Sequence, residues 1–205
     1  MSFLEFRNAM FELACFNTNQ VYAWYPNFDS NNLTRWLKKG LLIKLRQSYY
    51  TFPEYLKFPD FASYFANRIY QPSYISLHSG LSFYGIIPES VTQITSVTTL
   101  KTFSFTNVFG EYSYKTINPS LFFGYDLKPL PDGRALQIAQ PEKALLDLLY
   151  LYPFYDSENE FSDLRLDDDY LSTDFDKNLF LEYAGQFKNK SLDKRLSMLI
   201  KTYNL

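Results

Sequence analysis

The feature that most constrains the fold is an amphipathic stretch from Ser30 to Tyr50. Its apolar residues Leu33, Trp36 and Leu37 stand three and four positions apart, which is the spacing that places side chains on one face of a helix. Gly40 follows them, and glycine tolerates the left-handed conformation in which many helices end. The pattern therefore predicts a short amphipathic helix that stops at Gly40.

A two-stranded ribbon is predicted after this helix. Leu41–Leu45 and Tyr49–Phe52 carry the apolar residues, and Arg46-Gln47-Ser48 between them has the composition of a turn with a basic tip. A helix followed by such a ribbon is the outline of a winged helix-turn-helix, whose second helix enters the major groove of DNA.

The residues upstream supply the other helices of such a module. Phe3–Phe16 has apolar residues at helical intervals, and Thr18 is placed to cap a second, shorter helix. Asp29 or Ser30 is expected to cap the helix that follows. We therefore expect a winged-helix DNA-binding domain over residues 1–58.

The predicted recognition helix and ribbon are strongly basic. Residues 30–50 contain five basic and no acidic side chains, a local charge of +5 in a chain whose net charge is −2. A confined basic stripe on a mildly acidic chain favours a nucleic-acid face, the alternative being a solvated helix beside an unrelated hairpin. Arg and Asn can pair with base edges, and Lys and Arg with phosphates. We expect base reading by Asn31, Thr34 and Arg35, and phosphate contacts by Lys38, Lys39, Lys44 and Arg46.

The composition fits a folded intracellular protein of two modest domains. Of the 205 residues, 46% are hydrophobic and 20% aromatic, which excludes a disordered chain and indicates strands in addition to helices. Cys15 is the only cysteine, so it cannot form an internal disulfide and suits the core of a protein in a reducing cytoplasm. The sequence has neither a signal-peptide pattern nor an apolar run that could span a bilayer. We expect a cytoplasmic location and no membrane partner.

Residues 59–205 predict a mixed α/β domain, so the expected fold class is α+β. Helices are predicted from Pro59 to the residue before Pro72, over Ser76–Tyr84, over Pro141–Leu151 and from a Ser191 cap onward; strands are predicted over Gln93–Thr99 and Ala135–Ala139, with a hairpin that pairs Phe103 and Phe105 with Tyr112 and Tyr114. Residues 156–176 hold nine acidic side chains, one arginine and few regularly spaced apolar groups. We expect that segment to be solvated and partly mobile.

The last predicted helix has a basic outer face. Leu192, Leu196 and Leu199 are expected to point inward. A solvated helix face is the simpler interpretation of its other side, and a partner surface or second nucleic-acid surface is the alternative. The basic residues expected on this side are Lys190, Lys194, Arg195 and Lys201.

Groups that could carry catalysis are few. His78 is the only histidine, so a zinc site of the usual ligands is unsupported and we expect a structural role for this residue. The sequence has neither a Gly-x-Ser-x-Gly nucleophile turn nor a Gly-rich phosphate loop. Asp167-Asp-Asp169 could hold Mg²⁺, but no basic loop that would position phosphates accompanies it, and we interpret it as an acidic loop. We expect no enzyme, no cofactor and no metal site.

Several runs of residues resemble one known family. They are Leu33–Leu45, Tyr74–Glu89, Thr95–Thr99, Phe122–Gly124 and Ile138–Asp147. In these runs the chain resembles the AbiEi-like antitoxins of bacterial type IV (abortive-infection) toxin–antitoxin systems. The resemblance extends to about Leu151, and its second part, from Tyr74 to Asp147, is the more specific one.

The resemblance implies a function for each half of the chain. The N-terminal winged helix would bind operator DNA and repress its own operon. The C-terminal domain would counteract a nucleotidyltransferase-like toxin, without necessarily forming a stable complex with it. Composition and spacing alone indicate only a DNA-reading module joined to an α/β body, so a stand-alone winged-helix regulator whose C-terminal domain dimerises or senses a ligand is the alternative. One helix reads little sequence, so either protein would need a dimer or cooperative binding to DNA repeats.

Overall fold

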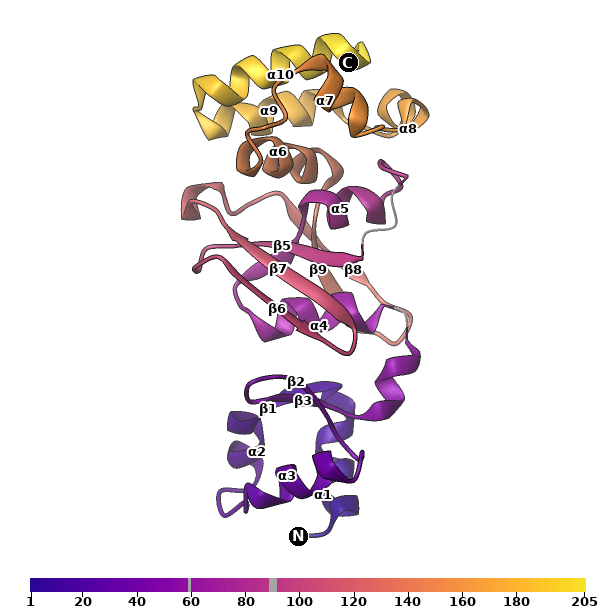
Figure 1. Ribbon diagram of the computed structural model, residues 1–205, viewed down its shortest axis with the longest axis vertical. Helices are drawn as coiled ribbons and strands as arrows, with labels where there is room; N and C mark the ends of the chain where they lie inside the picture. The colour runs from indigo at the N-terminus through magenta and orange to yellow at the C-terminus, as the bar shows by residue number, and fades with distance from the viewer. Residues whose placement is uncertain (59, 89–91) are drawn as a thin grey trace.

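The computed structural model describes residues 1–58, 60–88 and 92–205, and its helices and strands are arranged along one long axis (Figure 1). A small N-terminal unit lies at one end, a six-stranded sheet in the middle and a layer of helices at the other end. The expected mixed α/β composition is confirmed. The predicted helix start at Pro59 and the end of the run Tyr74–Glu89 lie outside the described residues.

The N-terminal unit combines helices with a three-stranded antiparallel sheet of order β1-β3-β2. Asn17 and Gln20 form a capping box that starts the second helix, so the cap is Asn17 and not Thr18. The elements are α1 (Phe3–Met10), η1 (Phe11–Leu13), β1 (Cys15–Asn17), α2 (Thr18–Trp24), α3 (Asn31–Lys38), β2 (Ile43–Arg46) and β3 (Tyr49–Thr51).

The first helix is shorter than predicted. It ends at Met10 instead of Phe16, because Ala14 has a φ of 59° and Cys15–Asn17 leaves the helix to pair with β3. The periodic apolar residues continue past the helix end because η1 and β1 bury their side chains in the same core as α1. The spacing of apolar residues alone could not show whether the chain after Met10 continues the helix or leaves it, because either conformation buries these side chains.

The middle of the chain forms a mixed six-stranded sheet of order β6-β7-β5-β4-β9-β8, in which β5 with β7 and β4 with β9 are parallel pairs. The predicted hairpin is confirmed, since Phe103 pairs with Tyr114 and Phe105 with Tyr112. The elements are η2 (Pro53–Lys57), α4 (Phe61–Ile69), β4 (Ser73–Ile75), α5 (Leu77–Phe83), β5 (Gln93–Thr98), β6 (Phe103–Asn107), β7 (Gly110–Thr116), η3 (Pro119–Leu121), β8 (Tyr125–Pro129) and β9 (Ala135–Ala139).

The C-terminal part is a helical layer built on α6 (Pro141–Leu151), whose predicted bounds are confirmed. Residues 144–149 of α6 are all buried, because the sheet and α5 lie on one side of this helix and the later helices lie on the other. The later helices are α7 (Glu158–Asp163), α8 (Asp168–Thr173), α9 (Lys177–Phe187) and α10 (Lys190–Tyr203). The cap of α10 is Asn189, whose side chain accepts hydrogen bonds from two backbone amides, and not Ser191 as expected.

Residues 156–176 form regular helices, although the sequence pattern predicted no regular element there. Ser157, Asp167 and Asp176 cap α7, α8 and α9, each accepting a hydrogen bond from a backbone amide. Phe161 and Leu171 are buried between these helices. The acidic residues therefore begin short helices, whose turns break the regular apolar spacing that would have identified them.

Two cores hold the molecule together. One lies between the sheet and the C-terminal helices, whereas the other runs from the N-terminal unit into α4 and side chains of β6, β7 and β9. Within the second core, a line of aromatic rings connects the N-terminal unit with α4, from Phe11 to Tyr55 (5.2 Å between centroids), Tyr55 to Phe61 (5.0 Å) and Phe61 to Phe65 (5.7 Å). The predicted boundary at residues 58 and 59 therefore separates two sheets that share a continuous core.

Candidate nucleic-acid interface

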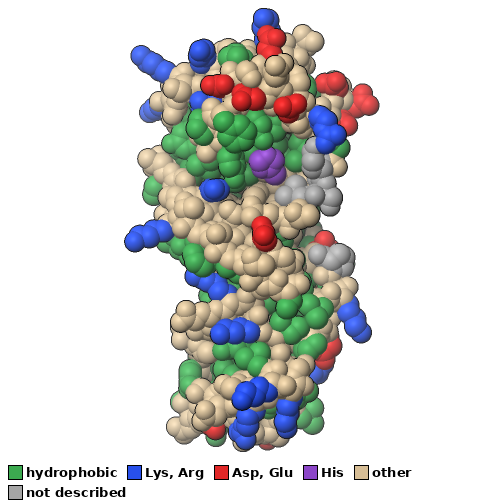
Figure 2. All heavy atoms as spheres, in the orientation of Figure 1, with side chains coloured by type: hydrophobic (Ala, Val, Ile, Leu, Met, Phe, Trp, Pro, Cys, Tyr) green, Lys and Arg blue, Asp and Glu red, His purple; other side chains and the backbone are tan. Residues whose placement is uncertain are grey.

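Helix α3 has one buried and one exposed face. Leu33 and Trp36 retain 4% and 7% of their exposure, and the Trp36 ring lies 4.6 Å from that of Phe6. The helix lies at the end of the molecule opposite the C-terminal helices, and Lys and Arg side chains gather over it (Figures 1 and 2). The exposed face consists of Asn31, Thr34, Arg35, Lys38 and Lys39, which the structure therefore brings together.

The end of α3 follows the prediction. Gly40 has a φ of +67°, and the amide of Leu41 donates to the carbonyl of Trp36 at 2.9 Å. At the start of the helix the side chain of Ser30 makes no capping bond, while Asp29 Oδ1 accepts from the amide of Asn31 at 3.0 Å. Asp29 is therefore the capping side chain of the two that were expected.

Arg35 is held by two neighbours on its own side of the molecule. Its Nη2 donates to Oδ1 of Asn32 and lies 3.8 Å from Oδ2 of Asp29. The side chains of Arg35 and Asp29 are 64% and 54% exposed, and an ion pair so open to water contributes about 0–1 kcal/mol. Arg35 can therefore leave Asp29 for a stronger acceptor, such as a base edge, at little cost in free energy.

The buried Asn32 was not identified from the sequence as a partner of Arg35. The spacing of three residues between them on one helix was the available indication.

The ribbon tip does not face outward. The guanidinium of Arg46 lies 4.1 Å from the ring centroid of Phe103, and its Nη1 donates to the carbonyl of Ile69 at 3.4 Å. Next to it, Nδ2 of Asn107 donates to the carbonyl of Leu45 at 3.0 Å. The expected phosphate contact of Arg46 is therefore not supported, because the aromatic surface of the six-stranded sheet takes up this side chain. Lys44 on the same strand remains exposed.

Replacing Arg46 by Ala is expected to lower the free energy of unfolding by about 1–2 kcal/mol, because the cation–π contacts and a hydrogen bond between the two sheets are lost. Urea unfolding followed by circular dichroism measures the change. Arg46→Lys is the matched control for charge, and it should recover only part of the loss because an ammonium does not stack on a ring as a planar guanidinium does. Unchanged stability together with weaker DNA binding would instead return Arg46 to a phosphate role.

The basic face of α10 is smaller than expected. Lys190 and Lys194 are exposed, and Lys201 forms a solvent-exposed ion pair with Glu158 at 3.4 Å. Arg195 is only 8% exposed, so its assignment to the outer face is wrong. It follows Leu192 by three positions and precedes Leu196, which turns it toward the buried side of the helix.

A buried polar cluster in the second half escaped sequence reasoning. Lys143 Nζ pairs with Oδ1 of Asp147 and donates to the hydroxyl of Tyr74 at 2.8 Å. Tyr74 and Ser76 each donate to Oδ2 of Asp147, at 2.9 and 2.8 Å. Both charged side chains are fully buried, and burial lowers the pKa of Lys143 and raises the pKa of Asp147 while their contact opposes both shifts. The four-residue spacing of Lys143 and Asp147 was the available indication.

The other side chains that were considered for chemistry have structural partners. Asp167 caps α8, and Asp168 and Asp169 lie in its first turn. His78 Nε2 lies 3.0 Å from the hydroxyl of Tyr155. Within residues 1–58, 60–88 and 92–205, no group of three or more His, Cys, Asp or Glu side chains is placed to hold a metal ion.

Comparison with protein families and with curated proteins identifies no relative of this chain. No protein-family model matches the chain, and no curated protein matches it. Among the described helices, none has both the length and the apolar character needed to cross a bilayer.

Proposed function

We propose that residues 1–58 form a winged helix-turn-helix that binds operator DNA through α3. The observation that carries this proposal is the exposed face of α3, on which cationic and amide side chains stand together at the end of the molecule. The order of α1, β1, α2, α3, β2 and β3 also supports it, since a helix pair followed by a hairpin is the arrangement of this module.

In the proposed complex α3 lies in the major groove. Asn31, Thr34 and Arg35 contact base edges, and three lysines contact phosphates: Lys38, Lys39 and Lys44. The ribbon tip contacts the six-stranded sheet instead of DNA in this arrangement, because Arg46 is packed against Phe103. Three phosphate contacts correspond to a salt slope of about −2.7 per half-site. Two copies on DNA, as a dimer or cooperatively on repeats, would supply specificity.

Replacing Arg35 by Ala is expected to weaken binding to the DNA upstream of the gene by about 1–3 kcal/mol and to reduce discrimination at one base pair. Lys38→Ala should weaken binding to all sequences alike and make the salt slope shallower by about 0.9. Fluorescence anisotropy with labelled duplexes at several salt concentrations measures both effects. Lys177→Ala, an exposed lysine at the start of α9 in the C-terminal helical layer, is the matched control. An Arg35→Ala protein that binds with unchanged affinity and sequence preference would exclude this placement of α3.

We also propose that the protein is an antitoxin and autorepressor of a type IV toxin–antitoxin operon, acting against a nucleotidyltransferase-like toxin. The resemblance of the residues from Tyr74 to Asp147 to AbiEi-like antitoxins supports this proposal. Because the N-terminal core continues into α4, the activity is best dissected with full-length variants instead of a truncation at residue 59.

Growth of cells that express the adjacent open reading frame tests the antitoxin proposal. The full chain and its Arg35→Ala variant should both restore growth when expressed from a foreign promoter, because neutralisation is assigned to residues 59–205. A non-toxic neighbour, or no rescue by the full chain, would favour the alternative function of a stand-alone winged-helix regulator whose C-terminal domain dimerises or senses a ligand.

A further inference from the structure

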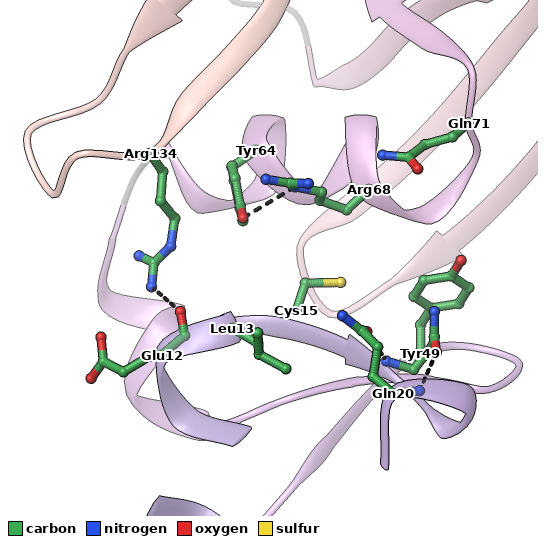
Figure 3. A pocket seen from close by; sticks show the side chains of 10 residues that line it. Glu12, Leu13, Cys15, Gln20, Tyr49, Tyr64, Arg68, Gln71 and Arg134 are labelled. Atoms are coloured by element: carbon green, nitrogen blue, oxygen red, sulfur yellow. Dashed lines mark hydrogen bonds between the residues drawn. The ribbon is translucent and has the colours of Figure 1, made fainter. Parts of the chain in front are cut away.

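A polar cavity of about 370 Å³ lies at the seam between the N-terminal unit and α4 (Figure 3). Its lining comes from segments far apart in the sequence: Asn17 and Gln20 at the start of α2, Tyr49 on β3, Arg68 near the end of α4 and Gln71 just after that helix. The volume lies within the range of small-molecule sites, roughly 300–1,000 Å³, and such sites gather where two parts of a fold meet.

Arg68 brings a positive charge to the cavity without a carboxylate to balance it. The Nε of Arg68 donates to the hydroxyl of Tyr64 at 3.1 Å. Within the described residues, Arg68 makes no other hydrogen bond and no ion pair. In Figure 3 the guanidinium lies along the α4 side of the cavity. The bond from Nε fixes the side chain and leaves both terminal nitrogens as a planar fork. Such a fork matches two oxygens of a phosphate or a carboxylate.

The opposite wall offers further donors. Asn17 Oδ1 accepts from the amide of Gln20 at 3.0 Å, and Gln20 Oε1 accepts from the amide of Asn17 at 2.8 Å. Because this capping box uses both side-chain oxygens, the side-chain NH₂ groups of the two residues remain as donors. The lining therefore presents donors from both the N-terminal unit and α4.

Negative charge is kept away from the middle of the cavity. Glu12 lies at the rim, and its carboxylate is turned away from the other lining side chains in Figure 3. Burial raises the pKa of the Cys15 thiol to about 12, so this group is neutral at physiological pH. Arg134 at the same rim donates to the carbonyl of Glu12 at 3.1 Å and is ion-paired with Asp132, so the unbalanced positive charge of the lining is that of Arg68.

We infer that this cavity binds a small organic anion, which it recognises by a phosphate or carboxylate group held on the fork of Arg68. The amide groups of Asn17, Gln20 and Gln71 then meet the remaining polar atoms of the ligand. Because Asn17 and Gln20 belong to the N-terminal unit and Arg68 to α4, the bound anion joins the two parts of the molecule. The site does not depend on the proposed DNA contact, so DNA binding and anion binding can fail separately.

Isothermal titration calorimetry of the full chain tests the inference. The probes are inorganic phosphate, adenosine monophosphate and succinate, with adenosine as the uncharged comparison. We expect saturable binding of at least one anion and none of adenosine, and the preferred anion distinguishes a phosphate ligand from a carboxylate ligand. Arg68→Gln should weaken that binding at least tenfold, which corresponds to about 1.4 kcal/mol.

Two further variants separate binding from folding. Gln20→Glu keeps the capping box, since Glu accepts the same backbone bond, but it places a negative charge in the cavity and should also weaken binding at least tenfold. Lys194→Gln removes a charge far from the cavity and should change nothing. Thermal unfolding without ligand checks that each variant is folded. No saturable heat with any of the three anions, or equal affinity in the wild type and Arg68→Gln, would overturn the inference.

Discussion

Replacing Lys143 by Met is expected to lower the free energy of unfolding by about 3–5 kcal/mol at neutral pH, because Asp147 is then left as a buried carboxylate without its cation. The hydroxyls of Tyr74 and Ser76 still donate to Asp147 but carry no charge. Urea unfolding followed by circular dichroism measures the loss. Lys194→Met, an exposed lysine changed in the same way, should alter stability by no more than about 0.5 kcal/mol.

The pH dependence of this deficit has a defined sign. Removing the Lys143 cation raises the folded-state pKa of Asp147 further above its ordinary value, since burial already raises it and the cation opposes that shift. A folded-state pKa above the unfolded one means that the folded protein binds the proton more tightly. The deficit should therefore be largest above the raised pKa and shrink as pH falls toward the ordinary carboxyl value.

A double variant distinguishes an unpaired charge from a simple packing defect. Lys143→Met with Asp147→Leu removes both charges and should be more stable than Lys143→Met alone, because no carboxylate remains buried. Equal stability of the single and double variants, or a loss in Lys143→Met no larger than in Lys194→Met, would contradict this account of the cluster.

Replacing Phe65 by Ala is the second change with a large expected effect. Phe65 is fully buried on α4, and its ring lies 4.8 Å from Tyr112 and 5.7 Å from Phe61. The loss of such a ring from a core costs about 3–5 kcal/mol. Because the aromatic core continues through Tyr55 into the N-terminal unit, we expect the unit over residues 1–58 to unfold at the same lower midpoint as the rest.

The positions of the two tryptophans make this prediction measurable. Trp24 and Trp36 are the only tryptophans and both lie in the N-terminal unit, so fluorescence reports that unit while circular dichroism reports the helices of the whole chain. The two midpoints should coincide in the wild type and move together in Phe65→Ala. Phe65→Leu, which keeps most of the volume, should shift both by less. A fluorescence midpoint that stays in place while the other falls would mean that residues 1–58 fold independently.

Several elements could be predicted from local pattern because their causes are local. Helix α3 and its stop at Gly40, the pairing of Phe103 with Tyr114 and the bounds of α6 all follow from the spacing of apolar residues and from turn chemistry. The exposed cluster around Arg35 belongs to the same class, since a helix with one apolar face must present its other residues together.

Other features depended on contacts between distant segments. Arg46 and Arg195 have the sequence context of solvent-facing cations, but one lies on the rings of the sheet and the other is buried in the helical layer. The short helices over residues 156–176 carry too few apolar residues per turn to show a period, and they fold because α6 and α10 cover them.

The sequence by itself therefore determined which residues of α3 point outward and which strands pair in the hairpin, because these depend on side-chain spacing over one element. The tertiary structure alone decided that the ribbon tip faces the sheet, that Lys143 and Asp147 are buried together, and that Arg68 lies across a cavity from Asn17 and Gln20. These outcomes depend on which surfaces meet. Charged side chains such as these lower their free energy only when the right partner is brought to them by segments far away in the chain.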